Sequence, residues 1–390
     1  MDKLRVLHFA DLVNGHDFID NIVRNTDPAM FDMAVCTMGR ASNIEEPDYA
    51  EAGIARWDIP APTRSHYPRA VVRLAALLRH QDIDIIHAHH YEPCLIAAAA
   101  TVAHPRTKLV VGRHYADAIY LHTAGWRRRA MLGLERAVNT RARLVIAPSQ
   151  RIATLLDRQG VPPGKVAIIP YAFDPARFDH VLARSAGTKR SALDTDGRFT
   201  IGTFGRLYAD KGHRFVLEAL PTILKSVPNL SYVIVGEGAE RPQLERQVRA
   251  LDLERVVSFL GWRHDVAELM KAVDVVVQPS LQEAFSQSMA EALFLARPLV
   301  ITDVSGANEL IPHDSMGVVV PCRDAAALGR ALIALEGDPH RRGAMAEAGR
   351  RHACATLSIN TVVPLYEAAY RATAESARTD LRRSRAQCGG

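Results

Sequence analysis

One stretch of sequence decides the fold, and it reads Gln278-Pro-Ser-Leu-Gln-Glu283-Ala-Phe-Ser-Gln-Ser-Met-Ala-Glu291-Ala-Leu-Phe-Leu-Ala-Arg-Pro298-Leu-Val-Ile301. Apolar runs at 273–277 and 299–301 predict two strands that flank it. From Ser286 onward the apolar residues recur at the spacing of one helix face, which predicts a helix. Glu283 therefore lies in the loop before that helix.

The same stretch suits an anionic ligand that carries a polyol. Glu291 follows Glu283 by eight residues, so at about 100° per residue both carboxylates can border one pocket. Free N–H groups at a helix start favour an anion such as a diphosphate, and Glu291 suits the hydroxyls of a ribose. The residues that offer those N–H groups are Phe285, Ser286, Gln287 and Ser288. A structural alternative is that Ser288 and Glu291 form a capping box and Glu283 is an ordinary loop carboxylate.

A second motif, Phe204-Gly205-Arg206-Leu-Tyr-Ala-Asp-Lys211-Gly212, follows a predicted strand at 199–204 and ends where a helix begins. Glycine lets a ligand approach the backbone closely, and a guanidinium and an ammonium five residues apart can converge on one polyanion. The structural alternative is a solvated surface pair.

Histidines follow two strands predicted in the first half of the chain. His87, His89 and His90 close the segment 83–90, and His114 follows the strand at 109–111. A metal site is not favoured, because His87 and His89 share one strand face and spacing marks no carboxylate or thiol partner. The structural alternative for His114 is a strand-end histidine bonded to a backbone carbonyl.

Length and composition predict a two-domain globular protein. The chain has 390 residues, of which 48% are hydrophobic and 23% charged, and its net charge is +5 with a pI near 9.0. A mildly basic chain fits anionic substrates or a membrane surface. Five scattered cysteines predict reduced thiols in the cytoplasm. The apolar runs are too short for a signal peptide or a membrane span.

Apolar runs alternate with amphipathic helical patterns almost throughout, which predicts parallel strands joined by crossover helices. We expect an N-terminal domain over 1–175, a linker over 176–198 and a C-terminal domain over 199–356. A C-terminal helix over 357–375 and a basic, disordered tail over 376–390 complete the chain. The predicted strands lie at 5–9, 33–36, 83–87, 109–111, 144–147, 166–169, 199–204, 232–235, 256–259, 273–277, 299–301 and 318–320.

Together these motifs resemble the large family of retaining, nucleotide-sugar-dependent glycosyltransferases (family 4-like, "glycosyl transferases group 1"). The resemblance rests on Glu-(seven residues)-Glu at 283–291 and Gly-Arg-(four residues)-Lys-Gly at 205–212, within a region of good similarity over 82–351. It implies an α/β protein of the GT-B fold, in which two Rossmann-like domains face each other across a deep cleft.

The resemblance also implies roles for individual residues. Arg206 and Lys211 hold the donor diphosphate, with Gly205 and the N–H groups of 285–288, and Glu291 binds the ribose. Glu283 contacts the donor sugar in a supporting electrostatic role, and His114 orients that sugar. The turn that contains Arg263 meets the nucleobase, and the first-strand loop faces the acceptor. That loop holds Asn14, Gly15 and His16, with a single glycine where the family usually has two.

The implied reaction moves a sugar from a nucleoside diphosphate, UDP or GDP, to a hydroxyl of a glycan, a lipid-linked or a small-molecule acceptor. No metal or other cofactor is expected, because we find no Asp-x-Asp motif of the kind that metal-dependent glycosyltransferases of the other main fold use. Basic helices at 69–79 and 126–132 allow peripheral contact with the inner face of a membrane. No nucleic-acid partner is indicated. The alternatives are a sugar-nucleotide epimerase on the same fold and a non-catalytic partner protein.

Overall fold

The protein is described by a computed structural model. It describes the chain except residues 1–2, 12–16, 40–48, 116–124, 185–192, 194, 196 and 388–390; for Asp17 and 376–387 only the backbone is described. The chain divides into two compact units. The first comprises 1–173 and 359–390, and the second comprises 174–358.

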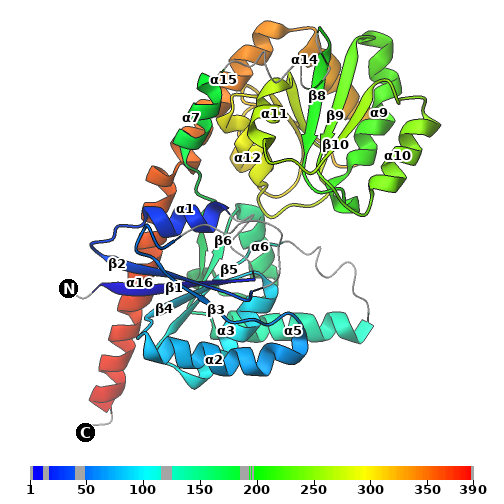
Figure 1. The fold of residues 1–390 in the computed structure, drawn as a ribbon. Coiled ribbons are helices and arrows are strands. Elements are labelled where there is room, and N and C mark those ends of the chain that lie inside the picture. The colour runs from blue at the N-terminus through cyan, green and yellow to red at the C-terminus, as the bar shows by residue number, and fades with distance from the viewer. Residues whose placement is uncertain are drawn as a thin grey trace. The chain divides into compact units, whose positions relative to one another are not determined.

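The first unit is a seven-stranded parallel sheet in the order β3-β2-β1-β4-β5-β6-β7, with helices on both faces (Figure 1). The strands are β1 (Leu4–Ala10), β2 (Phe31–Thr37), β3 (Ala55–Asp58), β4 (Ile85–His89), β5 (Lys108–Gly112), β6 (Leu144–Ala147) and β7 (Val166–Ile168). The helices are α1 (Asp17–Asn25), η1 (Arg64–His66), α2 (Tyr67–His80), α3 (Tyr91–Ala103), α5 (Gly125–Arg141), α6 (Gln150–Arg158), η2 (Pro163–Lys165) and α16 (Ile359–Gln387).

The second unit is a six-stranded parallel sheet in the order β10-β9-β8-β11-β12-β13, also covered on both faces (Figure 1). The strands are β8 (Phe199–Phe204), β9 (Leu230–Val235), β10 (Val257–Gly261), β11 (Val275–Gln278), β12 (Leu299–Thr302) and β13 (Val318–Val320). The helices are α7 (Pro175–Ala183), η3 (Ala209–Lys211), α9 (His213–Ser226), α10 (Arg241–Ala250), α11 (Val266–Ala272), α12 (Gln287–Phe294), α13 (Ala307–Leu310), α14 (Ala325–Glu336) and α15 (Pro339–Leu357).

The strands form where the sequence has continuous apolar runs, because both faces of each sheet are covered. The side chains of Val275, Val276 and Val277 on β11 are fully buried, as this rule requires. Each predicted strand has a counterpart in the structure. The prediction missed β3, which reads Ala-Arg-Trp-Asp and lies at the sheet edge, where polar and exposed residues are tolerated.

The boundary regions differ from the sequence expectation. The chain divides after Phe173, and the segment expected as a linker begins with α7. Asp174 caps this helix by accepting from Ala176 N at 3.0 Å, and Phe178 stacks on Phe294 of α12 at 5.0 Å. The expected disordered tail continues as helix in α16 as far as Gln387. Phe178 and Val181 are buried, and Lys271 of α11 donates to the Val181 and Leu182 carbonyls at 3.0 and 2.9 Å. These tertiary contacts add to the cap, and the apolar pattern of nine residues is too short to predict the helix.

In each sheet the order in which successive strands are added changes side once, and this switch point predicts where a ligand binds. The reversal lies between β1 and β4 in the first sheet and between β8 and β11 in the second. In open parallel sheets ligands bind beside the carboxyl ends of the strands at such a switch point. The loops after these four strands are therefore where a ligand is expected to bind.

Candidate functional site

Two glycines hold the loops at the switch point of the second sheet in close contact. Gly212 adopts φ +67°, and a Cβ there would lie 2.0 Å from the carbonyl oxygen of Pro279 in the loop after β11. Gly236 adopts φ +140°, and a Cβ there would lie 1.9 Å from the carbonyl oxygen of Gly205. Only glycine fits either position. The loop after β8 is thus packed against the loops after β9 and β11.

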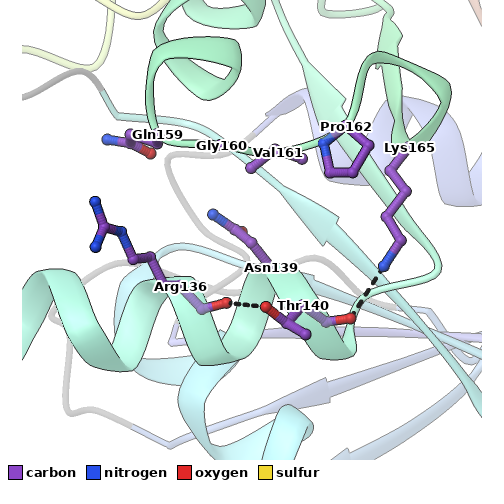
Figure 2. A pocket seen from close by; sticks show the side chains of 8 residues that line it. All are labelled: Arg136, Asn139, Thr140, Gln159, Gly160, Val161, Pro162 and Lys165. Atoms are coloured by element: carbon purple, nitrogen blue, oxygen red, sulfur yellow. Dashed lines mark hydrogen bonds between the residues drawn. The ribbon is translucent and has the colours of Figure 1, made fainter.

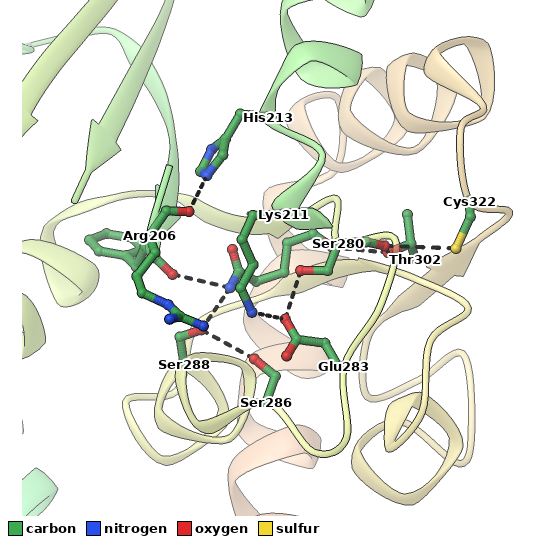
Figure 3. Close-up of polar contacts among 11 residues, drawn as sticks. Arg206, Lys211, His213, Ser280, Glu283, Ser286, Ser288, Thr302 and Cys322 are labelled. Carbon is green, nitrogen blue, oxygen red and sulfur yellow. Dashed lines mark hydrogen bonds and ion pairs between the residues drawn. The ribbon is translucent and has the colours of Figure 1, made fainter. Parts of the chain in front are cut away.

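Lys211 and Glu283 form an ion pair at this switch point. The Lys211 ammonium donates to Glu283 Oε1 at 2.6 Å, and the Ser280 hydroxyl donates to the same oxygen at 2.8 Å (Figure 3). The two charged side chains are 16% and 9% exposed. An ammonium has three donors, so Lys211 can keep Glu283 and still bind a ligand oxygen. The fold thus brings together two of the predicted site residues.

Gln278, at the end of β11, joins the other parts of the site. Its Nε2 donates to the Phe204 carbonyl at 3.1 Å and to Ser288 Oγ at 2.6 Å. Phe204 is the last residue of β8, and Ser288 lies in the first turn of α12. The amide side chain therefore fixes the helix start relative to the Gly205 loop.

The capping-box alternative is wrong. α12 begins at Gln287 with Ser286 as its N-cap residue, and the Ser286 side chain makes no capping hydrogen bond. Ser288 lies inside the first turn, where its hydroxyl accepts from Gln278 and pairs with Ser286 Oγ at 3.2 Å. The N–H groups at the start of α12 are therefore not satisfied by a side-chain cap from Ser286.

The other predicted donor residues also belong to the second unit. Arg206 is exposed, stacks over the Tyr208 ring at 5.3 Å, and points toward Ser286 and Ser288 in Figure 3. Glu291 is half-buried one turn farther along α12. Phe285 and Arg263 have different settings. Phe285 is 4% exposed and is a packing residue, and Arg263 forms an exposed ion pair with Asp265 at 2.8 and 2.9 Å.

The switch point of the first sheet carries a smaller set of polar side chains. Asp11, just after β1, lies 3.4 Å from the ring of His90, just after β4. The predicted acceptor residues Asn14, Gly15 and His16 lie outside the described residues. His114 follows β5, and its ring nitrogens pair with His89 at 2.8 Å and the Tyr171 hydroxyl at 3.1 Å. Both of these partners are side chains, whereas the structural alternative predicted a hydrogen bond from His114 to a backbone carbonyl.

A buried histidine cluster lies beneath His114. Strand register places His8 of β1 beside His87 of β4, and the ring nitrogens of His8, His87 and His89 lie within 4.8 Å of one another. All three side chains are fully buried. These are the described residues whose donor set is closest to a metal site. Sequence spacing missed His8, because it precedes His87 by 79 residues and only the sheet pairs them.

Burial keeps these histidines neutral. It lowers the pKa of His8 to about 3 and lowers the pKa values of His87 and His89 well below their usual range, with further lowering by neighbouring imidazoles for the latter two. In the second unit, burial lowers the pKa of His213 to about 4. An unfolded chain would protonate each of them near pH 6.5.

Acid is expected to lower the stability of the first unit. Below about pH 6.5 the unfolded state binds protons that the folded state does not. The free energy of unfolding of the first unit therefore decreases as the pH is lowered. We expect a loss of about 1.4 kcal/mol for each of His8, His87 and His89 between pH 7.5 and 5.5. Urea unfolding at the two pH values measures it. The variant His87→Gln should remove about a third of this loss. The control variant His80→Gln, at an exposed position, should remove none of it. Equal free energies of unfolding at the two pH values would contradict the prediction that these histidines stay neutral in the folded state.

A pocket of about 290 Å³ lies elsewhere in the first unit (Figure 2). It is lined by the end of α5 and the segment before β7, namely Arg136, Asn139, Thr140, Gln159, Gly160, Val161, Pro162 and Lys165. Lys165 donates to the Thr140 and Ala142 carbonyls at 3.0 and 3.1 Å, which closes the end of α5. The pocket borders the amino ends of β6 and β7. It therefore lies beside the amino-terminal ends of the strands, whereas the switch-point loops follow their carboxyl-terminal ends.

Known sequence families match both units. Residues 198–338 match the family described as "Glycosyl transferases group 1", and residues 18–177 match "Glycosyltransferase Family 4". A D-inositol 3-phosphate glycosyltransferase from Corynebacterium urealyticum is 28% identical over 234 residues, which cover 57% of this chain and 55% of that protein. An alpha-D-kanosaminyltransferase from Streptomyces kanamyceticus is 31% identical over 188 residues, which cover 44% and 49%. The chain spans about half the length of these curated relatives.

Solved structures match over nearly the whole chain. HepE from Anabaena, solved in complex with UDP-glucose, aligns with a TM-score of 0.77 at 21% identity, over 96% of this chain and 99% of that chain. A glycosyltransferase from Rickettsia africae aligns with a TM-score of 0.78 at 17% identity, over 96% and 99%. These likenesses bear on the fold, which is GT-B as predicted. Within the described part of the chain, no helix combines the length and apolarity that a membrane span requires.

Proposed function

Because this chain belongs to the GT-B glycosyltransferases of group 1 and family 4 type, we propose that it transfers a sugar from a nucleoside-diphosphate-sugar donor to a hydroxyl acceptor. One observation carries the proposal. The ion pair of Lys211 and Glu283 stands beside the start of α12, at the switch point of the second sheet. A cation, a helix start and a carboxylate at one strand end suit a ligand that joins a diphosphate to a sugar.

In the proposed mechanism the leaving diphosphate is stabilised by positive charge. Arg206 offers a planar fork to phosphate oxygens, and Lys211 adds a point charge. The N–H groups at the start of α12 add the positive end of the helix dipole. Negative charge grows on the diphosphate as the bond to the sugar breaks, so fixed donors lower the barrier without a metal ion. Metal independence is part of the proposal.

Glu283 is proposed to act on the sugar rather than on the diphosphate. Its Oε1 already accepts from Lys211 and Ser280, so the carboxylate is held in one orientation. A negative charge there stabilises the positive charge that develops on the sugar carbon as the leaving group departs. We propose departure and attack on the same face, with retention of configuration. Glu291 is proposed to accept from the ribose hydroxyls, and His114 to contact the donor sugar.

UDP is the proposed nucleotide to test first. HepE from Anabaena, which has this fold, is solved in complexes with UDP and with UDP-glucose, and a relative from Escherichia coli is named for UDP-Gal. GDP remains the second choice. The named acceptors of the relatives include an inositol phosphate and a lipid-linked sugar. The acceptor class proposed here is a hydroxyl of a glycan, a lipid-linked or a small-molecule acceptor.

Calorimetric titration with UDP, GDP, ADP and TDP, each with and without Mg²⁺, tests the proposal. We expect one of the four to bind at micromolar concentration, with affinity unchanged by Mg²⁺, because the proposed site supplies its own cations. An absolute requirement for Mg²⁺ would contradict the metal-free mechanism. Failure of all four to bind would favour the non-catalytic alternative.

A product assay then separates the two enzymatic alternatives. A glycosyltransferase supplied with the matching donor and an acceptor releases one free nucleoside diphosphate for each sugar transferred. An epimerase would return an isomer of the sugar nucleotide at equilibrium, without stoichiometric transfer to an acceptor. Acceptor-dependent release of the diphosphate is the expected result.

A further inference from the structure

Hydrogen bonds between aromatic side chains run through the interior of the first unit. This series of hydrogen bonds begins near the carboxyl end of β5 and ends on the C-terminal helix α16 and the strand β4. We name it the histidine chain. Its members, in order, are Tyr171, His114, His89, His8, Tyr370 and His87.

Three of its links involve the central imidazoles. His114 Nε2 pairs with His89 Nδ1 at 2.8 Å. His89 Nε2 pairs with His8 Nδ1 at 3.0 Å. His8 Nε2 then pairs with the Tyr370 hydroxyl at 3.2 Å. Both ring nitrogens of His89 and of His8 are therefore in use.

The two ends of the chain differ. At one end, His114 Nδ1 pairs with the Tyr171 hydroxyl at 3.1 Å. At the other, the Tyr370 hydroxyl also pairs with His87 Nδ1 at 2.8 Å, so it bridges two histidines. His87 Nε2 is buried and has no hydrogen-bond partner among the described residues. That unpartnered atom ends the chain.

The order of the atoms couples the tautomers. A neutral imidazole has one N–H donor and one acceptor nitrogen, and every link joins the Nε2 side of one ring to the Nδ1 side of the next. The single proton of Tyr370 can be donated in only one direction. If each link is to have a donor and an acceptor, and the Tyr370 proton is itself to be donated within the chain, all four histidines carry the proton on Nδ1 or all carry it on Nε2. One mixed arrangement lets His8 Nε2–H and His87 Nδ1–H both donate to the Tyr370 oxygen, and it leaves the buried Tyr370 O–H without an acceptor among the described residues. Every other mixed arrangement leaves two donors or two acceptors facing each other.

The unpartnered nitrogen selects between the two directions. Protonation on Nε2 throughout would leave His87 with a buried N–H donor and no acceptor, whereas protonation on Nδ1 leaves it with a lone pair. Orphaned buried N–H groups are rarer than under-satisfied acceptors. His87 Nε2 lies 3.1 Å from where a Cβ on Gly112 would stand, so it faces the Cα hydrogen of that glycine. A lone pair tolerates that neighbour better than an N–H does.

We infer that Tyr370 and His8 are positioning residues that hold His114 as the tautomer protonated on Nδ1, through a chain in which all four histidines share that tautomer. The consequence is that the C-terminal helix sets the chemistry of a residue at the end of β5. Gly112 is part of the arrangement, because a Cβ there would lie 2.3 Å from His114 Nε2. The inference concerns protons within one unit and does not depend on the proposed function.

A metal ion at His8, His87 and His89 is the competing interpretation. Their geometry would allow it, but the links of the chain already engage both ring nitrogens of His8 and His89. A metal bound there would have to break at least one of these links. The hydrogen-bonded state accounts for all but one of the ring nitrogens, so the observations favour it.

Nitrogen NMR of the full-length protein labelled with ¹⁵N-histidine tests the inference at pH 7. We expect the signals of His8, His87, His89 and His114 to show one pyrrole-type nitrogen each, at Nδ1 in every ring. Single histidine-to-glutamine variants assign the four spin systems. Different tautomers among the four rings would overturn the shared chain, and Nε2 protonation throughout would overturn its direction.

Tyr370→Phe then tests the role of α16. Without the bridging hydroxyl, we expect a second population protonated on Nε2 to appear in His8, His89 and His114 together. Tyr366→Phe is the matched control, since its hydroxyl on the same helix bonds the Pro170 carbonyl at 3.5 Å and should leave the spectrum unchanged. An unchanged His114 in Tyr370→Phe would overturn the positioning role. Addition of Zn²⁺ should not alter the wild-type signals, and loss of the shared tautomer with Zn²⁺ would establish the metal site instead.

Discussion

Lys211→Ala is expected to weaken binding of the nucleoside diphosphate by roughly 30- to 1,000-fold, while binding of the nucleoside alone changes little. Truncation of one partner in a buried, hydrogen-bonded charge pair costs about 2 to 4 kcal/mol. Here two effects add. The phosphate oxygens lose a cation, and Glu283, whose side chain is only 9% exposed, becomes an unpaired carboxylate close to the diphosphate. Calorimetric titration with the diphosphate and the nucleoside in parallel measures both losses.

A double variant separates the two effects. In Lys211→Ala/Glu283→Gln the unpaired charge is gone, so we expect part of the lost diphosphate affinity to return. Lys225→Ala is the control, because Lys225 is an exposed lysine in the last turn of α9, away from the switch point. Equal losses for the diphosphate and the nucleoside would show that Lys211 supports the loop rather than the phosphates.

The sequence predicted that Lys211 and Glu283 belong to one site because each lies in a short local motif, where a strand ends and a helix begins. Gly205, Arg206 and Lys211 span one turn, and Glu283 precedes a helix whose period is clear. Gln278 and Ser280 were missed as contacts, although they lie in the quoted stretch. Their partners come from β8, the loop and α12, and a linear pattern does not reveal which polar side chain points toward which strand end.

The histidine chain shows the same limit more strongly. His87 and His89 were visible as a cluster, but the links to His8 and Tyr370 span 81 and 283 residues of sequence. Those contacts depend on the order of strands in the sheet and on where α16 packs. A hydrophobic pattern predicts that strands and helices exist, and it does not fix the order of the strands in the sheet or the place where a helix packs. Tertiary pairing therefore had to be seen before the coupled tautomers could be inferred.

Gly236→Ala is expected to destabilise the second unit by about 3 to 5 kcal/mol and to abolish measurable binding of the nucleoside diphosphate. A methyl group at this position would stand 1.9 Å from the Gly205 carbonyl oxygen, and the residue would have to keep φ +140°. Overpacking and a conformation restricted to glycine each cost about 1 to 3 kcal/mol. The loops are also joined by backbone bonds, from Gly205 N to the Val235 carbonyl at 3.0 Å and from Leu207 N to the Glu237 carbonyl at 2.9 Å. Relief of the clash must therefore move Arg206 as well.

Differential scanning calorimetry measures this destabilisation, as a fall of roughly 10 °C in the transition of the second unit. Gly343→Ala is the matched control, because a Cβ there meets nothing within 4 Å and the residue lies in α15. Alanine is the better helix former by about 1 kcal/mol, so this control should raise the transition temperature slightly. A Gly236→Ala variant that keeps both its stability and its affinity for the diphosphate would mean that the loops can separate. In that case the close contact between the loops after β8 and β9 does not hold Arg206 in place.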